Sequence, residues 1–131
     1  MGGAVPLGLG PGSLAILAFL NVEQQQEIMQ RNRPRLESWP QLAGEQFQQK
    51  LNQTVEQGFA LDPGELIPGL AGIAVPIHVA GAGVVGSAGI TFLSPRLNAD
   101  MQQRYVALLQ QEVAAIAPLI SPLDTRLRAS L

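Results

Sequence analysis

The spacing of apolar residues changes along this chain, from a helical spacing near both ends to a strand spacing between them. Three N-terminal segments have the spacing of helices: an apolar stretch at 14–20, a glutamine-rich stretch at 22–31, and a stretch at 44–57 that ends before Gly58. The first contains no polar residue, so we expect it to be buried on all sides. The residues expected to face inward in the second and third helices are Val22, Ile28, Met29, Phe47, Leu51 and Val55.

Strands are predicted in the middle of the chain. Phe59–Leu61 is a short strand, and Asp62-Pro63-Gly64 has the composition of a turn that follows it. Two longer strands, Leu70–Ala80 and Val84–Leu93, flank the glycine-rich turn at 81–83 and form a hairpin. On the first long strand Ile73, Val75, Ile77 and Val79 are expected to share one face, opposite Ala74, Pro76 and His78; on the second, Val84, Ile90 and Phe92 are expected to oppose Val85, Ser87, Gly89, Thr91 and Leu93.

A long C-terminal helix is predicted to begin after Asn98, whose side chain can cap it. Asp100 is favourable in its first turn, and Pro122 is expected to end it. Helices on either side of a run of strands make this an α+β chain. The predicted apolar stripe of the last helix consists of Met101, Tyr105, Leu108, Leu109, Val113, Ile116 and Ile120.

The composition is that of a single folded domain. With 131 residues, of which 47% are hydrophobic and 14% charged, the chain can build one core but not two. Its formal net charge of -2, with Lys50 as the only lysine, argues against nucleic-acid binding by this stretch. The chain has no cysteine, which fits the reducing cytoplasm, and we expect a cytoplasmic protein.

Two uncharged stretches have the length or composition of membrane signals. Residues 1–20 lack the basic region of a secretory signal, and glycines and Pro11 interrupt them. Residues 66–93 contain no Asp, Glu, Lys or Arg, but Pro68, Pro76 and several glycines interrupt them. A buried hairpin is therefore favoured over a membrane span, and no membrane partner is expected.

The residues that catalysis needs are poorly represented. His78 is the only histidine, and a lone histidine on a strand is usually a structural or surface residue. No cluster of His, Cys and carboxylate residues indicates a metal site. Neither Ser13 nor Ser87 stands in the Gly-x-Ser-x-Gly motif of hydrolases. We therefore expect no enzyme activity, no metal and no cofactor.

The segment Gly8–Ser13 comes close to a dinucleotide-binding motif, but Ser13 replaces the third glycine and no βαβ unit follows. A glycine turn that leads into a helix leaves the N–H groups of Gly12 and Ser13 at the positive end of the helix dipole, where a small carboxylate can bind. A turn that only begins a buried helix has the same residues. Asp62 is equally consistent with a turn former, and Thr91 with an ordinary strand residue.

Segments spread over nearly the whole chain resemble the effector-binding domain of IclR-family transcription regulators, in the same order and with the same spacing. Residues 6–18, PLGLGPGSLAILA, are similar to the family's entry into the first helix of that domain. The other similar stretches are Gly58–Asp62, Glu65, Pro68–Leu70 and Gly72–Pro76, which resemble the family's most characteristic region, and Val84–Phe92 with Ser94–Leu97, which resemble its last strand and the following loop.

The resemblance implies a GAF-like or profilin-like antiparallel sheet flanked by helices. It also implies a sensor of a small organic acid or aromatic metabolite that acts as a homodimer or tetramer. Operator DNA would be bound by a winged helix-turn-helix that, like the opening strand pair of the domain, is absent from this chain. Residues 1–131 would then be a single, N-terminally truncated effector-binding domain. The alternative is a stand-alone GAF-like small-molecule binding or scaffolding protein without a DNA role.

Site residues follow from the same resemblance, position by position. Because only Thr91 keeps a hydroxyl and Gly72 has no side chain, the pocket is expected to be less polar and roomier than one built for glyoxylate. The implied ligand-binding positions are the helix-entry amides of Gly12 and Ser13, the pocket acid Asp62, the small residue Gly72, and Gly89 and Thr91 at strand positions that are often hydroxylic.

The resemblance also implies an exposed sheet edge. Because the opening strand pair that would lie beside a later strand is absent, we expect Val84–Leu93 to form a bare edge. This strand carries no Lys, Glu or Pro to protect the edge, so we expect association or segment exchange to cover it.

Overall fold

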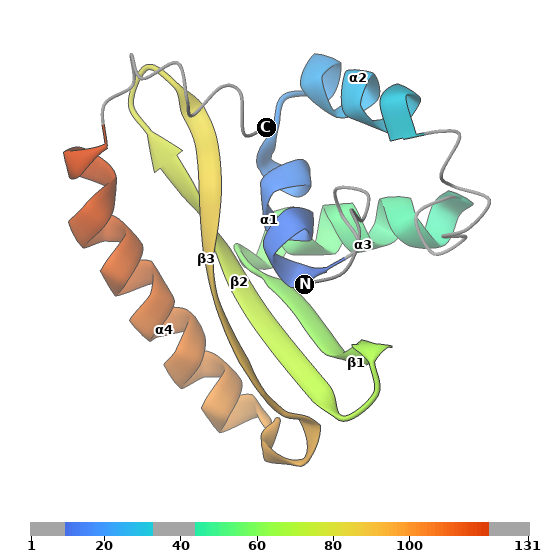
Figure 1. The fold of residues 1–131 in the computed structure, drawn as a ribbon, viewed down its shortest axis with the longest axis vertical. Helices are drawn as coiled ribbons and strands as arrows, with labels where there is room; N and C mark the ends of the chain where they lie inside the picture. The colour runs from blue at the N-terminus through green and yellow to red at the C-terminus, as the bar shows by residue number, and fades with distance from the viewer. Residues whose placement is uncertain (1–9, 33–43, 121–131) are drawn as a thin grey trace.

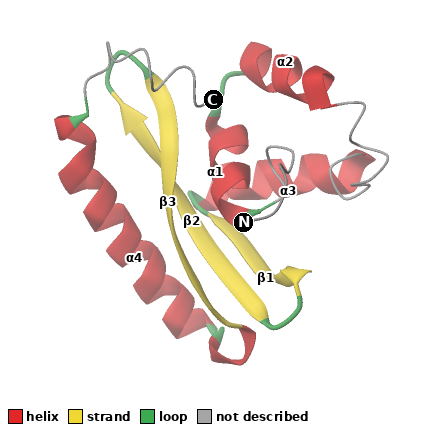
Figure 2. Cartoon of the chain, in the orientation of Figure 1, coloured by secondary structure: helices red, strands yellow, loops and turns green. Residues whose placement is uncertain are grey.

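The computed structural model describes residues 10–32 and 44–120, and Figure 1 shows how their helices and strands are arranged. Helices come first, strands follow, and a long helix comes last (Figure 2). This arrangement confirms the α+β class predicted from the sequence. The elements are α1 (Pro11–Phe19), α2 (Val22–Asn32), α3 (Gly44–Gln57), β1 (Ala60–Ile67), β2 (Leu70–Val79), β3 (Gly83–Leu93) and α4 (Ala99–Ile116), with 3-10 turns at Ser94–Arg96 and Ala117–Leu119.

The strands form a three-stranded antiparallel sheet in the order β1-β2-β3. The predicted hairpin is β2 with β3, which pair from Leu70 opposite Leu93 to Val79 opposite Gly83. The uncharged stretch at 66–93 is therefore mostly sheet. No helix in the described part of the chain has the length and the hydropathy needed to cross a membrane.

Helices cover the sheet on both faces (Figure 1). α4 packs on one face, where Leu109 joins a buried cluster with Ile73 and Val75 of β2. α1 packs on the other face, where Ala74 of β2 belongs to a separate buried cluster with Leu14. The predicted division of β2 into two faces is confirmed, and both faces contribute to the core.

β1 is longer than the short strand predicted at 59–61, because the Asp62-Pro63-Gly64 turn lies within it. The side chain of Asp62 accepts hydrogen bonds from the N–H groups of Gly64 at 2.9 Å and Glu65 at 2.8 Å. Gly64 adopts a φ of 120°, which side-chain-bearing residues rarely adopt. The turn interrupts the pairing with β2 after Asp62, and pairing resumes at Ile67 opposite Leu70. The sequence predicted this turn correctly, but the turn does not end the strand. It forms an irregularity within β1, which is an edge strand of the sheet.

The predicted faces of β3 are wrong at the hairpin end. Ile77 pairs with Gly86 and His78 pairs with Val84, so Val85 is an extra residue on β3. A bulge of this kind shifts the alternation of side chains. Val84 consequently packs in the cluster of α1, while Val85 packs beside Ile77 on the face of α4. Val84 therefore does not share a face with Phe92, which packs with Leu109.

α1 is buried as predicted, whereas α2 and α3 differ from expectation by one residue each. Val22 is 67% exposed and Val55 is 49% exposed, although both were expected to face inward. On α3 the inward position belongs to Thr54, whose hydroxyl donates to the Lys50 carbonyl oxygen at 2.8 Å. That bond removes the cost of burying the hydroxyl, so a polar residue takes the place predicted for a valine.

α4 begins as predicted, because the side chain of Asn98 accepts a hydrogen bond from the Met101 N–H at 2.9 Å. Its inward face is narrower than the predicted stripe. Leu108 is 49% exposed and Ile116 is 39% exposed, since the single sheet face covers only one side of the helix. The helix was expected to end at Pro122, but it ends earlier, at Ile116, where the 3-10 turn Ala117–Leu119 follows. The side chains of α4 that pack toward the sheet are Tyr105, Val106, Leu109 and Val113.

Candidate functional site at the start of α1

The first turn of α1 has backbone N–H groups without an acceptor inside the helix, and it has no charged side chain. The helix begins after Gly10, with Pro11 in its first turn and no acidic residue there. The first bond along the helix is from the Leu14 N–H to the Gly10 carbonyl at 2.8 Å. Helical geometry leaves the N–H groups of Gly12 and Ser13 without an acceptor inside the helix. The Ser13 hydroxyl donates to the Gly10 carbonyl at 3.3 Å, so the side chain of Ser13 helps to shape the turn.

This end of α1 lies closely against the sheet. A Cβ added to Gly72 of β2 would stand 2.8 Å from Cγ of Pro11, which is too close for two carbon atoms. A Cβ added to Gly12 would stand 3.2 Å from the Ser87 Oγ of β3. Glycine at these positions therefore allows the helix to begin directly on top of the two strands.

A cavity of about 90 Å³ lies where the start of α1 meets β1, β2 and β3. Three of the predicted site residues line it, namely Asp62, Gly72 and Thr91. Pockets for drug-sized ligands measure about 300–1,000 Å³, so this one has room for a very small molecule only. The ring of Pro11 takes up the space that the absent side chain of Gly72 leaves.

Gly12, Ser13 and Gly89 are not among the residues that line this cavity. Gly12 and Ser13 follow Pro11, the residue of α1 that lines it. Gly89 is further along β3, where an added Cβ would stand 3.1 Å from the Ile73 carbonyl oxygen and 3.4 Å from Cβ of Ala74. Gly89 thus allows close approach between β2 and β3.

Asp62 is the only acidic residue among the described residues that line the cavity. Its side chain is buried, and Oδ1 accepts both hydrogen bonds from the β1 turn. An ionised carboxylate has further lone pairs on its second oxygen, so the role in the turn leaves it capacity to accept from a ligand. Neither lysine nor arginine is among the lining residues.

Sequence reasoning missed the apolar walls of the cavity. Pro11, Leu66 and Ile67 line it, and Ile67 is 54% exposed. Pro11 could have been suspected, because it lies between the glycines of the predicted turn. Leu66 and Ile67 could not, because their position depends on β1 continuing past the turn at Asp62. In the described ranges no group of His, Cys, Asp and Glu has the arrangement of a metal site.

The sequence matches the family described as "Bacterial transcriptional regulator IclR C-terminal" over residues 1–118. This chain belongs to that family. The match covers every described element through α4, including the three strands and the helix start that surround the cavity.

Solved structures of several bacterial transcription regulators and repressors have the same fold. The C-terminal domain of the E. coli transcriptional regulator KdgR superposes with a TM-score of 0.73 at 23% identity, over 89% of this chain and 72% of that one. The Agrobacterium tumefaciens repressor BlcR gives 0.71 at 16% identity, over 89% of this chain and 48% of BlcR. The Thermotoga maritima IclR gives 0.70 at 20% identity, with coverage of 89% and 48%.

These likenesses confirm the GAF-like fold expected from the sequence. The chain spans about half the length of BlcR and of the Thermotoga protein. A search of curated proteins finds no significant match.

Proposed function

We propose that this chain is the effector-binding domain of an IclR-type transcription regulator, and that the cavity beside Pro11 holds a small hydroxy acid. The observation that carries the proposal is the meeting of three separate segments at one cavity: the start of α1, Asp62 of β1 and Thr91 of β3. Asp62 and Thr91 are polar, and the role of Asp62 in the β1 turn leaves its second carboxylate oxygen able to accept from a ligand.

The start of α1 favours a carboxylate group. The N–H groups at a helix start carry partial positive charge, and the helix dipole adds to it. Neither lysine nor arginine is among the described residues that line the cavity, and the backbone N–H groups of Gly12 and Ser13, which follow Pro11, supply positive potential near its α1 end. A ligand carboxylate therefore belongs at the end of the cavity that Pro11 lines.

Asp62 favours a hydroxyl group on the same ligand. An ionised carboxylate only accepts hydrogen bonds, so it repels a second carboxylate and attracts a donor. The Thr91 hydroxyl can donate or accept, which lets it bridge the two ends of a short ligand. A hydroxy acid of two or three carbons, such as glycolate or lactate, satisfies these groups and fits the size of the cavity.

The rest of the proposed role follows from the family. KdgR is described as a transcriptional regulator and BlcR as a repressor. By analogy, occupation of the cavity changes the affinity of a separate DNA-binding domain for its operator, in a cytoplasmic homodimer or tetramer. With its formal net charge of -2, this chain is not the part of the regulator that binds DNA.

Thermal unfolding in the presence of matched compounds tests the proposed ligand. We expect glycolate and lactate to raise the Tm by mass action, acetate and propionate to raise it less, and ethylene glycol to leave it unchanged. The Thr91→Val variant should lose the preference for the hydroxy acids. Equal shifts for acetate and glycolate would contradict the role of Asp62, and no shift with any acid would contradict the site.

A further inference from the structure

A larger cavity, of about 340 Å³, lies at the opposite end of β2. Ala74 is the last residue of β2 that pairs with β1, so Val75–Val79 have no strand partner on that side among the described residues. The cavity follows this free edge and shares no lining residue with the cavity at Pro11. Its volume falls in the usual range for small-molecule sites.

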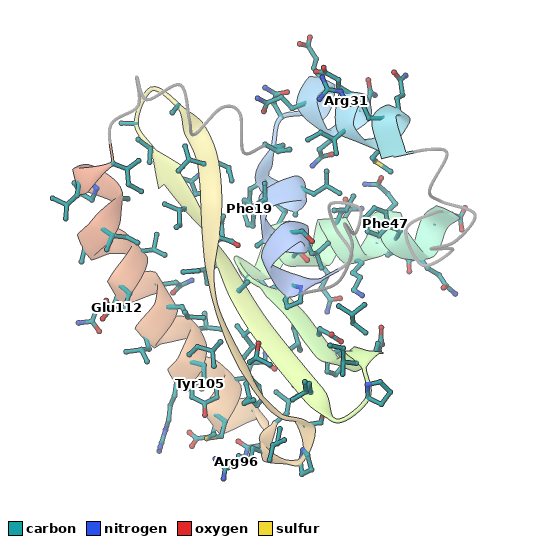
Figure 3. All side chains as sticks on the ribbon, in the orientation of Figure 1. Phe19, Arg31, Phe47, Arg96, Tyr105 and Glu112 are labelled. Atoms are coloured by element: carbon teal, nitrogen blue, oxygen red, sulfur yellow. The ribbon has the colours of Figure 1, made fainter. Side chains whose placement is uncertain are left out.

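The walls of this cavity come from both helical layers. Phe19, the last residue of α1, and His78 of β2 line one side, with their ring centroids 5.6 Å apart and their planes at 89°. Ala114 and Ala117, from α4 and the turn after it, line the other side. Figure 3 shows the side chain of Phe19 on α1, together with Glu112, which projects from the outer side of α4. Small residues facing an aromatic pair form a slot that suits a flat ring.

The polar groups of the cavity are few and neutral or weakly basic. Among the described residues that line the cavity, none is Asp, Glu, Lys or Arg. An ionised ligand would therefore lose its hydration without gaining a charged partner, which is costly. The His78 imidazole and the Gln110 amide can each both donate and accept hydrogen bonds. Gln110 reaches across the edge of the sheet, since its Nε2 would stand 3.8 Å from a Cβ on Gly58.

A peptide strand is a poor occupant of the same edge. Pro76 lies in the middle of the free stretch and has no N–H to donate to an added strand. The free stretch ends shortly afterwards, where β2 itself ends at Val79. These features favour a small molecule over an extended chain.

We propose that this cavity is a second ligand site, which takes a small neutral aromatic molecule with a hydroxyl group. The ring lies between Phe19 and Ala114, and the hydroxyl bonds to the Gln110 amide. The proposal does not depend on the hydroxy-acid site, because the cavities share no residue.

Phenol serves as the test ligand, and the proton NMR signals of His78 serve to detect its binding. As the only histidine of the chain, it gives one set of imidazole signals in a proton NMR spectrum. We expect phenol to shift these signals to saturation, because a bound ring adds its ring-current field. Benzoate, which has the same ring and a negative charge, should shift them much less. Equal binding of benzoate, or no saturable shift with phenol, would overturn the proposal.

A pair of neighbouring alanines supplies the matched variants. Ala114 lines the cavity and Ala115 does not, and both are exposed on α4. Ala114→Trp should fill the slot and weaken phenol binding at least about tenfold, which corresponds to about 1.4 kcal/mol. Ala115→Trp should bind phenol as the unmodified chain does. Equal phenol binding by the Ala114→Trp and Ala115→Trp variants would place the site elsewhere.

Two further measurements keep the test decisive. If Ala114→Trp does not fold by circular dichroism, Gln110→Leu removes an exposed amide instead and should weaken phenol binding several-fold; unchanged affinity would overturn the proposal. Sedimentation of the Ala114→Trp variant is measured as well. An altered oligomeric state without any phenol binding by the unmodified chain would assign the cavity to a contact between protein chains and overturn the ligand site.

Discussion

The ring of Pro11 lies directly over Gly72, with its Cγ 2.8 Å from the place that a Cβ on residue 72 would occupy. One residue begins α1 and the other lies in the central strand, so this contact sets the distance between helix and sheet at the candidate site. Gly72 also lines the small cavity. The absence of one methyl group therefore determines both the packing of α1 and the width of the pocket.

Gly72→Ala should destabilise the fold. The new methyl group cannot be accommodated without moving Pro11, and overpacking of this kind costs about 1–3 kcal/mol. Urea unfolding measures the change. Gly86→Ala is the matched control on the neighbouring strand, because its added Cβ would be 4.0 Å from the Ile77 side chain, an ordinary contact. Equal stability of both variants would mean that Pro11 moves aside freely.

Thr91→Val should weaken the effector without unfolding the chain. The substitution keeps the shape of the side chain and removes its hydroxyl, and an unsatisfied buried group in the complex costs about 1–3 kcal/mol. Thr91 is exposed in the absence of ligand, so the free energy of unfolding should hardly change. Calorimetric titration with glycolate or lactate gives the affinity. An unaltered affinity would mean that the Thr91 hydroxyl does not bind the effector and that Thr91 is an ordinary strand residue.

Asn98→Ala should destabilise α4 and the face of the sheet that it covers. The lost bond from the Met101 N–H is the only side-chain cap at this helix start, and such a loss costs about 0.5–2 kcal/mol. Asn98→Asp is the control, since aspartate caps as well as asparagine and favours the helix dipole. Thermal unfolding should rank aspartate at least equal to asparagine and well above alanine.

β3 should be covered by association in solution. Its outer side has no strand partner among the described residues, and the strand carries no charged side chain to discourage pairing. We expect sedimentation equilibrium to detect a dimer or a larger species, and hydrogen exchange to be slow along Val84–Leu93. A monomer at high concentration with fast exchange along this strand would show that the edge is tolerated uncovered.

The sequence predicts most elements of this fold because their signals are local. The Asn98 cap, the unbroken apolar run of α1 and the turn between β2 and β3 each depend on a few neighbouring residues. The bulge at Val85 is not local, since it exists only in relation to the residues that β2 places opposite. Thr54 was missed for a similar reason: its hydroxyl is satisfied by the Lys50 carbonyl, and hydropathy alone takes no account of that bond.

The candidate site was predicted in part. Asp62, Gly72 and Thr91 were named from the resemblance and line one cavity. Their spacing in the sequence alone does not predict that these residues line one cavity, because they come together only when the sheet forms. The larger cavity could not be foreseen at all. It depends on where β1 stops pairing, and on side chains such as Phe19 and Ala114 that look like ordinary core and surface positions in the sequence.

Helix α1 touches both cavities, with Pro11 of its first turn beside the smaller one and Phe19, its last residue, beside the larger one. The residues between these ends include Leu14 and Leu17, which are 2% and 1% exposed and close-packed. A helix held in this way resists bending, because bending would open voids along its length. If it tilts as one rigid body, a tilt that widens one cavity also changes the other. Ligands in the two cavities would then influence each other's affinity by the same factor in both directions.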